Sequence, residues 1–375
     1  MTRRVVVAMS GGVDSSVAAA LMQQQGYDVI GVTMQVWQSD DPEVEARQGG
    51  CCSLSAVGDA RRVASILGIP HYVVNMRDVF RRKVIDYFTS EYAAGRTPNP
   101  CVECNRSIKF AALLEKALDM GAPLVATGHY ARLHYDAVRQ RFVLGRPRDR
   151  RKDQSYVLYP LSQEQLAHVV FPLAELEKDE TRAIAQHLGL PVFDKPDSQE
   201  ICFVTDNDYA GFLQMQIPGR FRPGPIVDVD GKVLGQHRGL PHYTVGQRRG
   251  LGVSAPEPLY VLDIDEANNT LVVGTAAQGG CTGLSANDTV GVSEAAPSIG
   301  TWVPAEAQIR AHQVPKPCRY RLADDERQRL EVVFTEPQRG ITPGQAVVLY
   351  SGDEVVAGAT IDRSPESLLS SHRDG

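Results

Sequence analysis

Up to about residue 205, short apolar runs alternate with stretches of helical length in which apolar residues recur every three or four positions. Runs rich in Val and Ile that alternate with amphipathic helices are typical of a parallel sheet covered by helices. The first part of the chain is therefore predicted to be an α/β domain. The predicted strands are Val5 to Met9, Val29 to Trp37, His71 to Asn75 and Leu124 to His129, and the predicted helices are Ser15 to Gln25, Ser55 to Leu67, Val79 to Tyr92 and Ser107 to Met120.

Beyond residue 205 the helical period fades after one predicted helix at 208–214, and glycines and prolines separate short strands of alternating pattern. After about residue 286 further strand pairs follow one another, which favours a small β-barrel. We therefore expect three domains: the α/β domain over residues 1–205, a small central domain over 206–280 and a C-terminal β-barrel over 281–375.

The composition narrows the class of protein. The chain has 375 residues, 43% of them hydrophobic, and a net charge of −6, so nucleic acid would have to bind at a local basic patch. The apolar run Val5 to Met9 is too short for a signal peptide, and no stretch approaches the ~18 apolar residues of a membrane span. We expect a cytoplasmic protein without a membrane partner. Its seven cysteines are then packed thiols, metal ligands or reactive groups rather than a disulfide framework.

A glycine- and serine-rich segment, SGGVDSS at residues 10–16, lies between the first predicted strand and the first predicted helix. Its two glycines allow backbone N–H groups to turn toward an anion, and its hydroxyls add further donors. The positive end of the helix dipole faces the same point. The segment predicts a phosphate-binding loop; the alternative is a tight turn in which serine or aspartate caps the helix.

Three cysteines are candidates for reactive thiols or metal ligands. Cys101 and Cys104 form a C-x-x-C after two prolines, and Cys202 lies at the end of the α/β region. The helix predicted from Ser107 would place its N-terminus near Cys104 and favour the thiolate. A structural zinc would lack a fourth ligand at the usual spacing. The other cysteines are interpreted as packed or incidental thiols: Cys51, Cys52, Cys281 and Cys318.

Basic residues concentrate in residues 139–152, named here the basic segment. It contains seven arginines or lysines and one acid, Asp149, a local charge of +6. This excess suits contacts with phosphates, whereas the alternative is a solvent-exposed hairpin. Further basic residues lie at 237–249 and at Arg319 and Arg321. Together with Tyr320 they would suit the stacking of unpaired RNA bases.

SGGVDSS resembles the PP-loop of the ATP pyrophosphatase superfamily, whose members cleave ATP between the α- and β-phosphates. Together with further motifs, nearly the whole chain resembles the bacterial tRNA-uridine 2-sulfurtransferases, also called 2-thiouridylases. These further motifs are GRTPNP (residues 95–100), ATGHY (126–130), KDQSY (152–156), GLP (189–191), ICF (201–203), TVGQRRGLG (244–252) and TPGQ (342–345).

The resemblance implies a PP-loop domain of the adenine nucleotide α hydrolase type and ATP-dependent 2-thiolation of the wobble uridine in the anticodon stem-loop of tRNA. It implies that Cys104 is the nucleophile and that Cys202 carries a persulfide, which a cysteine desulfurase or sulfur relay protein supplies to a monomeric enzyme. The implied site for ATP with Mg2+ consists of Ala8, Met9, Ser10, Gly11, Gly12, Val13, Asp14, Ser15, Met34 and Gly128. The implied contacts with tRNA or its target base are Asn99, Pro100, Cys101, His129, Lys152, Asp153, Gln154, Arg319, Tyr320 and Gln345.

Alternatives stay open at this point. Some members carry Asp at the position of Cys101, and Cys101, Cys104 and Cys202 could instead hold a [4Fe-4S] cluster with one iron open to sulfide. The sequence does not separate this route from the persulfide. Two other functions are a PP-loop ligase or amidase with a nitrogen nucleophile, which would need neither Cys104 nor Cys202, and a non-catalytic RNA-binding protein.

Overall fold

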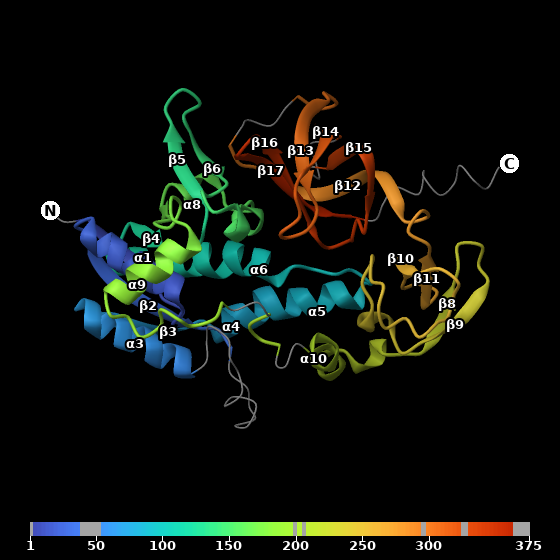
Figure 1. Ribbon diagram of the computed structural model, residues 1–375, viewed down its shortest axis with the longest axis horizontal. Helices are drawn as coiled ribbons and strands as arrows, with labels where there is room; N and C mark the ends of the chain where they lie inside the picture. The colour runs from blue at the N-terminus through green and yellow to red at the C-terminus, as the bar shows by residue number, and fades with distance from the viewer. Residues whose placement is uncertain are drawn as a thin grey trace.

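The computed structural model describes residues 3–37, 54–197, 201–204, 208–293, 298–323 and 329–362, which form three connected parts (Figure 1). The first part is built on a sheet with the strand order β3-β2-β1-β4-β7, and its neighbouring strands are parallel. The α/β prediction is confirmed, although β4 ends before the predicted His129. The strands are β1 (Arg4–Ala8), β2 (Asp28–Gln35), β3 (His71–Asn75), β4 (Leu124–Ala126) and β7 (Val169–Val170).

Helices cover both faces of this sheet because alternate strand residues point to opposite sides. Val5 and Val7 of β1 pack with α1, α3 and α9, whereas Val6 packs with α7 on the other face. No helix in the described ranges is both long and apolar enough to cross a membrane. The helices of this part are α1 (Val13–Gln24), α3 (Leu54–Leu67), α4 (Arg77–Phe80), η1 (Arg81–Ile85), α5 (Asp86–Ala93), α6 (Pro100–Glu103), η2 (Cys104–Ala112), α7 (Leu113–Asp119), η3 (Arg150–Lys152), η4 (Ser155–Val157), α8 (Gln163–Leu166) and α9 (Lys178–His187).

The order of the strands creates a switch point at β1. The chain passes from β1 to β2 and β3 on one side and later places β4 on the other side of β1. In sheets of this type ligands bind where the loops after two such strands part, at the carboxyl edge of the sheet. The SGGVDSS segment follows β1. The ATGHY motif begins at Ala126, the last residue of β4, and its other residues follow that strand, so both motifs lie at this edge.

The helix predicted from Ser107 begins at Pro100 instead. Oδ1 of Asn99 accepts a hydrogen bond from the N–H of Cys101 at 3.1 Å, and Pro100 takes the first helical position. From there α6, the π-helical η2 and α7 continue without a break. Cys101 therefore lies in the first turn, and Cys104 lies inside the helix rather than ahead of it.

The second part is a small sheet with the order β10-β11-β8-β9. The predicted helix of this part is present: it spans α10 (Tyr209–Gln216), and the side chain of Asp208 caps it. The 3₁₀ turns here are η6 (Pro218–Arg220) and η7 (Leu240–His242). The strands are β8 (Gly224–Val227), β9 (Val233–His237), β10 (Tyr260–Asp265) and β11 (Thr270–Gly274).

The third part is an antiparallel barrel that closes through the pairing of β12 with β17, as the sequence predicted. A hairpin of the first part, β5 (Arg132–Asp136) with β6 (Arg141–Gly145), joins this sheet through the pair of Gly145 with Glu354. The upright hairpin and the barrel stand side by side in Figure 1. The barrel strands are β12 (Gly280–Gly291), β13 (Val303–Gln308), β14 (Lys316–Leu322), β15 (Leu330–Arg339), β16 (Ala346–Ser351) and β17 (Glu354–Ile361).

The motifs TPNP and TPGQ connect the helix start to the barrel. The N–H of Thr97 donates to the carbonyl of Pro343 at 2.8 Å, and the side chain of Gln345 donates to the carbonyl of Thr97 at 2.7 Å. Gly344 has φ of +89°, and a Cβ there would lie 3.0 Å from the Thr97 backbone, so this contact requires glycine. The barrel thus helps to set the position of the helix that carries Cys101 and Cys104.

Candidate active site

The SGGVDSS loop has the geometry of an anion site. The N–H of Ser10 donates to Oγ of Ser15 at 3.1 Å, and the Ser16 hydroxyl donates to the Gly12 carbonyl at 2.8 Å. Gly12 is the N-cap of α1, and no side chain caps this helix. The first N–H groups of α1 consequently have no side-chain acceptor at the cap, which suits an anionic ligand.

Two glycines allow the loop to pack closely. Gly11 has φ of +70°, and a Cβ there would lie 2.2 Å from the Ala56 carbonyl oxygen. A Cβ on Gly128, after β4, would lie 2.6 Å from the backbone nitrogen of Ser15. Gly128 therefore lies directly against the start of α1, so the structure brings together the expected nucleotide residues after β1 and β4. Met34, near the end of β2, is half-buried beside the same edge.

A buried cation lies next to this loop, and the sequence did not predict it. Nζ of Lys178 is 2.7 Å from both carboxylate oxygens of Asp14, and the Tyr130 hydroxyl donates to Asp14 at 3.0 Å. Lys178 begins α9, where the helix dipole disfavours a cation, and this unfavourable position was the one available signal in the sequence. Lys195, also missed, donates to the carbonyl of Gly11 at 3.0 Å.

Asp197 links Lys178 to the KDQSY motif. Its carboxylate lies 2.7 Å from Nζ of Lys178 and 2.8 Å from Nζ of Lys152, and Arg182 approaches it at 3.5 Å. Burial alone would raise the pKa of Asp197, but hydrogen bonds from Lys152 and Lys178 hold this pKa below its usual value. Asp197 is therefore an anion at neutral pH. Lys152, an expected tRNA contact, lies at the outer end of this chain of charges.

Cys104 and Cys202 pack against the same hydrophobic cluster, whereas Cys101 is exposed. This cluster contains Val36 and Met76, which follow β2 and β3, so it lies at the same carboxyl edge as the phosphate loop. Among the described residues, which include all three of these cysteines, no group of three or more His, Cys, Asp or Glu side chains is placed to hold a metal ion.

The remaining cysteines are not part of this site. Burial raises the pKa of the Cys318 thiol to about 12, which fits the prediction of a packed, unreactive group. Cys281 is half-buried in the barrel. Cys51 and Cys52 lie outside the described residues.

His129 is a buried, neutral histidine. Its Nδ1 lies 2.7 Å from the Thr127 hydroxyl, and Nζ of Lys109 lies 3.5 Å from its Nε2. Burial, with the charge of Lys109 nearby, lowers the pKa of His129 well below its usual value. The ring contacts Phe110 and Phe171. Its contact with the target base stays a prediction.

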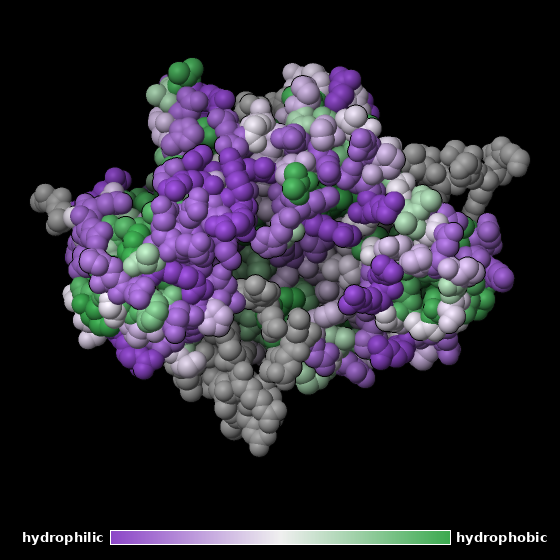
Figure 2. Space-filling view, viewed as in Figure 1, coloured by the Kyte–Doolittle hydropathy of each residue, from purple (hydrophilic) through white to green (hydrophobic). Residues whose placement is uncertain are grey.

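Ion pairs largely balance the charge of +6 in the basic segment, although Arg148, Arg150 and Arg151 are exposed. Most of its cations pair with carboxylates, some of them from distant parts of the chain. Figure 2 shows the hydrophilic surface over this region and α9. The pairs are Arg139 with Glu354, Arg146 with Asp153, Arg148 with Glu180, Arg150 with Asp353, Arg151 with Asp149 and Lys152 with Asp197.

The side chains expected to contact tRNA differ in their placement. Arg319 is exposed, but Tyr320 is 2% exposed inside the barrel core, so its ring cannot stack on a base as expected. The reason is strand alternation, which turns neighbouring side chains of β14 to opposite faces. The amide of Gln345 is engaged by Thr97, and Gln154 accepts from the N–H of Tyr130 at 2.9 Å.

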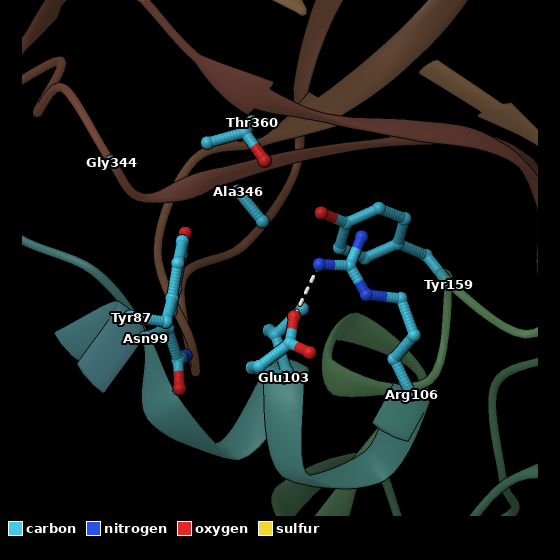
Figure 3. A pocket seen from close by; sticks show the side chains of 9 residues that line it. Tyr87, Asn99, Glu103, Arg106, Tyr159, Gly344, Ala346 and Thr360 are labelled. Carbon is cyan, nitrogen blue, oxygen red and sulfur yellow. Dashed lines mark hydrogen bonds and ion pairs between the residues drawn. The ribbon is translucent and has the colours of Figure 1, made fainter. Parts of the chain in front are cut away.

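A narrow cleft lies between α6 and the barrel (Figure 3). Tyr87, Glu103 and Arg106 line it from the helical side, and Thr360 lines it from β17. Glu103 is buried and pairs with Arg106 and with the Ser107 hydroxyl. These contacts stabilise the helix directly after Cys101 and Asn99.

Known protein families match this chain in three segments that correspond to its three parts. Residues 3–206 match the family described as tRNA methyl transferase HUP domain, residues 210–275 its PRC-barrel domain, and residues 283–361 the aminomethyltransferase beta-barrel domain. The tRNA-specific 2-thiouridylase MnmA of Desulforamulus reducens is 52% identical over 96% of this chain and 98% of that protein. The protein of the same name from Heliobacterium modesticaldum is 53% identical over 98% of this chain and 95% of that protein. The relatives' names thus specify thiolation, whereas the domain descriptions refer to methyl transfer.

Proposed function

The chain belongs to the tRNA-specific 2-thiouridylase family, and from this premise we propose that it replaces the C2 oxygen of the wobble uridine of tRNA with sulfur in an ATP-dependent reaction. As a member of this family it is a tRNA sulfurtransferase. One observation carries the ATP-dependent mechanism. The phosphate loop, Gly128 and the hydrophobic cluster that holds Cys104 and Cys202 occupy the same edge of one sheet.

The proposed first step activates the base. The phosphates of ATP, with Mg2+ as counter-ion, would bind the N–H groups and hydroxyls of residues 10–16. The C2 oxygen of uridine attacks the α-phosphorus, the bond between the α-phosphorus and the bridging oxygen breaks, pyrophosphate leaves, and N3 loses its proton to water. Adenylation is needed because the C2 oxygen of a uridine is a poor leaving group until it becomes part of a phosphate ester.

The second step transfers sulfur. In our proposal the terminal sulfur of a Cys202 persulfide adds to C2, and AMP leaves with the former C2 oxygen. The Cys104 thiolate then attacks the Cys202 sulfur and breaks the S–S bond to the base, which gives 2-thiouridine and a Cys104–Cys202 disulfide. Alternatively, Cys104 attacks first and frees hydrosulfide as the nucleophile. An external thiol reduces the disulfide, and a persulfide-carrying protein reloads Cys202.

A route through an iron–sulfur cluster finds less support. It requires Cys101, Cys104 and Cys202 as a converging set of ligands, and these three described side chains form no such group. Cys101 is exposed, whereas the other two thiols pack in the hydrophobic cluster. We therefore derive no step through a cluster.

Mass spectrometry of nucleosides tests the function. Unmodified tRNA is incubated with the protein, Mg-ATP and a persulfide donor, then digested. We expect 2-thiouridine, formed together with AMP and pyrophosphate, and no product when ATP is replaced by its α,β-methylene analogue. A product that contains nitrogen from added ammonia, with no thiolated base, would instead favour the ligase alternative.

Three matched variants test the thiols. Cys104→Ser and Cys202→Ser should each abolish 2-thiouridine while pyrophosphate release continues, because adenylation needs no thiol. Cys101→Ser, one helical turn from Cys104, is the control and should retain most of the activity. An inactive Cys101→Ser variant together with iron in anaerobically purified wild-type protein would overturn the persulfide route.

A further inference from the structure

Lys178 is the one lysine or arginine that is buried among the described residues, with 6% of its surface exposed. An ammonium group is costly to remove from water unless charged partners surround it. Lys178 also occupies the positive end of α9, where the dipole repels it. Its burial therefore depends on charged partners and the dipole opposes its position, which indicates that this position serves more than the stability of α9.

The partners of Lys178 are two carboxylates, Asp14 of the phosphate loop and Asp197, which follows α9 in the chain. It contacts both oxygens of Asp14, the second residue of α1, and one oxygen of Asp197, all at 2.7 Å. The N-terminus of α1, whose cap supplies no side-chain acceptor, begins at the residue before Asp14. The ammonium group therefore lies directly beside the backbone donors that suit an anion.

The two faces of the sheet separate the reacting groups. Cys104 lies in η2, which continues into α7, and α7 covers the face opposite to α1 and α9. In phosphoryl transfer the attacking and leaving oxygens lie in line on opposite sides of the phosphorus. If the base and the thiols approach from the side of η2, the pyrophosphate faces α1 and α9, where Lys178 lies.

We propose that Lys178 binds the β- and γ-phosphates of ATP, and that Asp14 and Asp197 hold its ammonium group in place until the nucleotide enters. The inference rests on the proposed use of ATP by this site. The phosphates carry more negative charge than one carboxylate and offer several acceptors to the three N–H donors of Lys178. The ammonium group then exchanges these two carboxylates for phosphate oxygens, and it balances the charge of the departing pyrophosphate.

A purely structural ion pair predicts a different behaviour. If Lys178 only orients Asp14 and α1, its loss distorts the whole loop and weakens every nucleotide that binds there. If it binds the outer phosphates, its loss weakens ATP but not AMP, which lacks them. The ratio of the two affinities therefore separates the two roles.

Calorimetric titration of the full chain with AMP and with Mg-α,β-methylene-ATP measures this ratio. For Lys178→Ala, and for Lys178→Gln as a variant that keeps hydrogen bonding to Asp14, we expect about tenfold to a hundredfold weaker binding of the analogue. AMP should bind within about twofold of wild type. Arg182→Ala is the matched control: Arg182 lies on the same helix and contacts Asp197 but not Asp14, so both affinities should keep their wild-type ratio.

Asp197→Asn gives a test of opposite sign. It removes one carboxylate that competes with the phosphates for Lys178, so the analogue should bind at least as tightly as to wild type. Weaker binding of the analogue by Asp197→Asn, or equal losses for AMP and the analogue in both Lys178 variants, would overturn the inference. Wild-type protein that binds neither nucleotide would instead refute the proposed function, and with it this assignment of Lys178.

Discussion

Two regions that contain arginines differ in whether carboxylates neutralise their positive charge. The basic segment holds its cations close together in sequence, but carboxylates from α9, from the barrel and from its own turns neutralise most of them. The second region consists of three arginines, which we call the junction arginines. They are Arg248 and Arg249 of the second part and Arg310 after β13. All three are exposed, and none forms an ion pair with a described residue.

The loop that carries Arg248 and Arg249 nevertheless lies next to Arg310. A Cβ on Gly246 would lie 2.5 Å from Nη2 of Arg310, so the loop that carries Arg248 and Arg249 touches the barrel at Arg310. This loop also reaches the TPGQ motif, because the Thr342 hydroxyl donates to the carbonyl of Val245 at 3.2 Å. Density of positive charge along a chain therefore does not measure the positive charge that a phosphate backbone meets.

The largest expected effect concerns tRNA affinity. Arg248→Ala with Arg249→Ala should weaken binding by about tenfold or more near 0.1 M salt, and should lower the slope of log affinity against log salt by about 1 to 2, because unpaired arginines release counterions from phosphates. Fluorescence anisotropy with labelled tRNA across a salt series measures both. Arg150→Ala with Arg151→Ala is the matched pair from the basic segment and should leave the slope nearly unchanged. Equal losses in the two pairs would remove the distinction between the regions.

A second prediction concerns the buried acid that organises the basic segment. Asp149 accepts hydrogen bonds from the N–H groups of Arg151 and Lys178 at 3.0 Å, and Asp149→Asn should lower the free energy of unfolding by about 1–3 kcal/mol. Burial would raise the pKa of Asp149, but the hydrogen bonds from Arg151 and Lys178 hold it below its usual value. Denaturant unfolding of both proteins at several pH values measures the difference.

The sign of the pH dependence follows from this lowered pKa. Because the folded state favours the ionised carboxylate, the stabilisation is complete above the unfolded pKa of about 3.9 and is lost as pH falls through the lower folded pKa. The difference between wild type and Asp149→Asn should stay constant from pH 8 to about 5 and shrink below about 4. A difference that already disappears near pH 6 would contradict the assignment.

The smallest expected effect is a gain. Asp353 pairs with Arg150 of the basic segment and lies 3.8 Å from Arg132 of β5, so Asp353→Ala should release both cations and tighten tRNA binding by roughly twofold to fivefold. The pair is exposed, so the free energy of unfolding should change by less than about 1 kcal/mol. Glu336→Ala, at an exposed acid of β15 without a salt bridge to a described residue, is the control for net charge. The same gain in both variants would indicate a general field effect.

Local patterns in the sequence predicted the strand, the turn and the helix around residues 10–16, because these elements follow from neighbouring residues. The strand His71 to Asn75 was predicted with its bounds, and α1 within two residues at its start. The predicted start of the helix that carries Cys101 and Cys104 was wrong, although the sequence contained the signal for the correct start. Asn99 followed by Pro100 is a favourable cap and first helical position, and it outweighs the period of apolar residues that begins later.

The proposed nucleotide site was only half visible from the sequence. Residues 10–16, Gly128 and Tyr130 stand in motifs, whereas Lys178 and Asp197 contribute through contacts over long separations in the chain. Nothing in the neighbourhood of Lys178 specifies Asp14 as its partner. Such pairs form because α9 packs beside α1 on one face of the sheet.

The sequence by itself determined the elements, the change from helical to β-rich pattern near residue 205, and the segments that carry chemistry. Hydrophobic period, caps and turn residues act over a few positions, so they are readable without the fold. Only the tertiary structure decided that the basic segment is neutralised, that Tyr320 points inward, and that Lys178 faces the phosphate loop. Ion pairs and burial depend on which distant side chains share a site, and packing of whole elements sets that proximity.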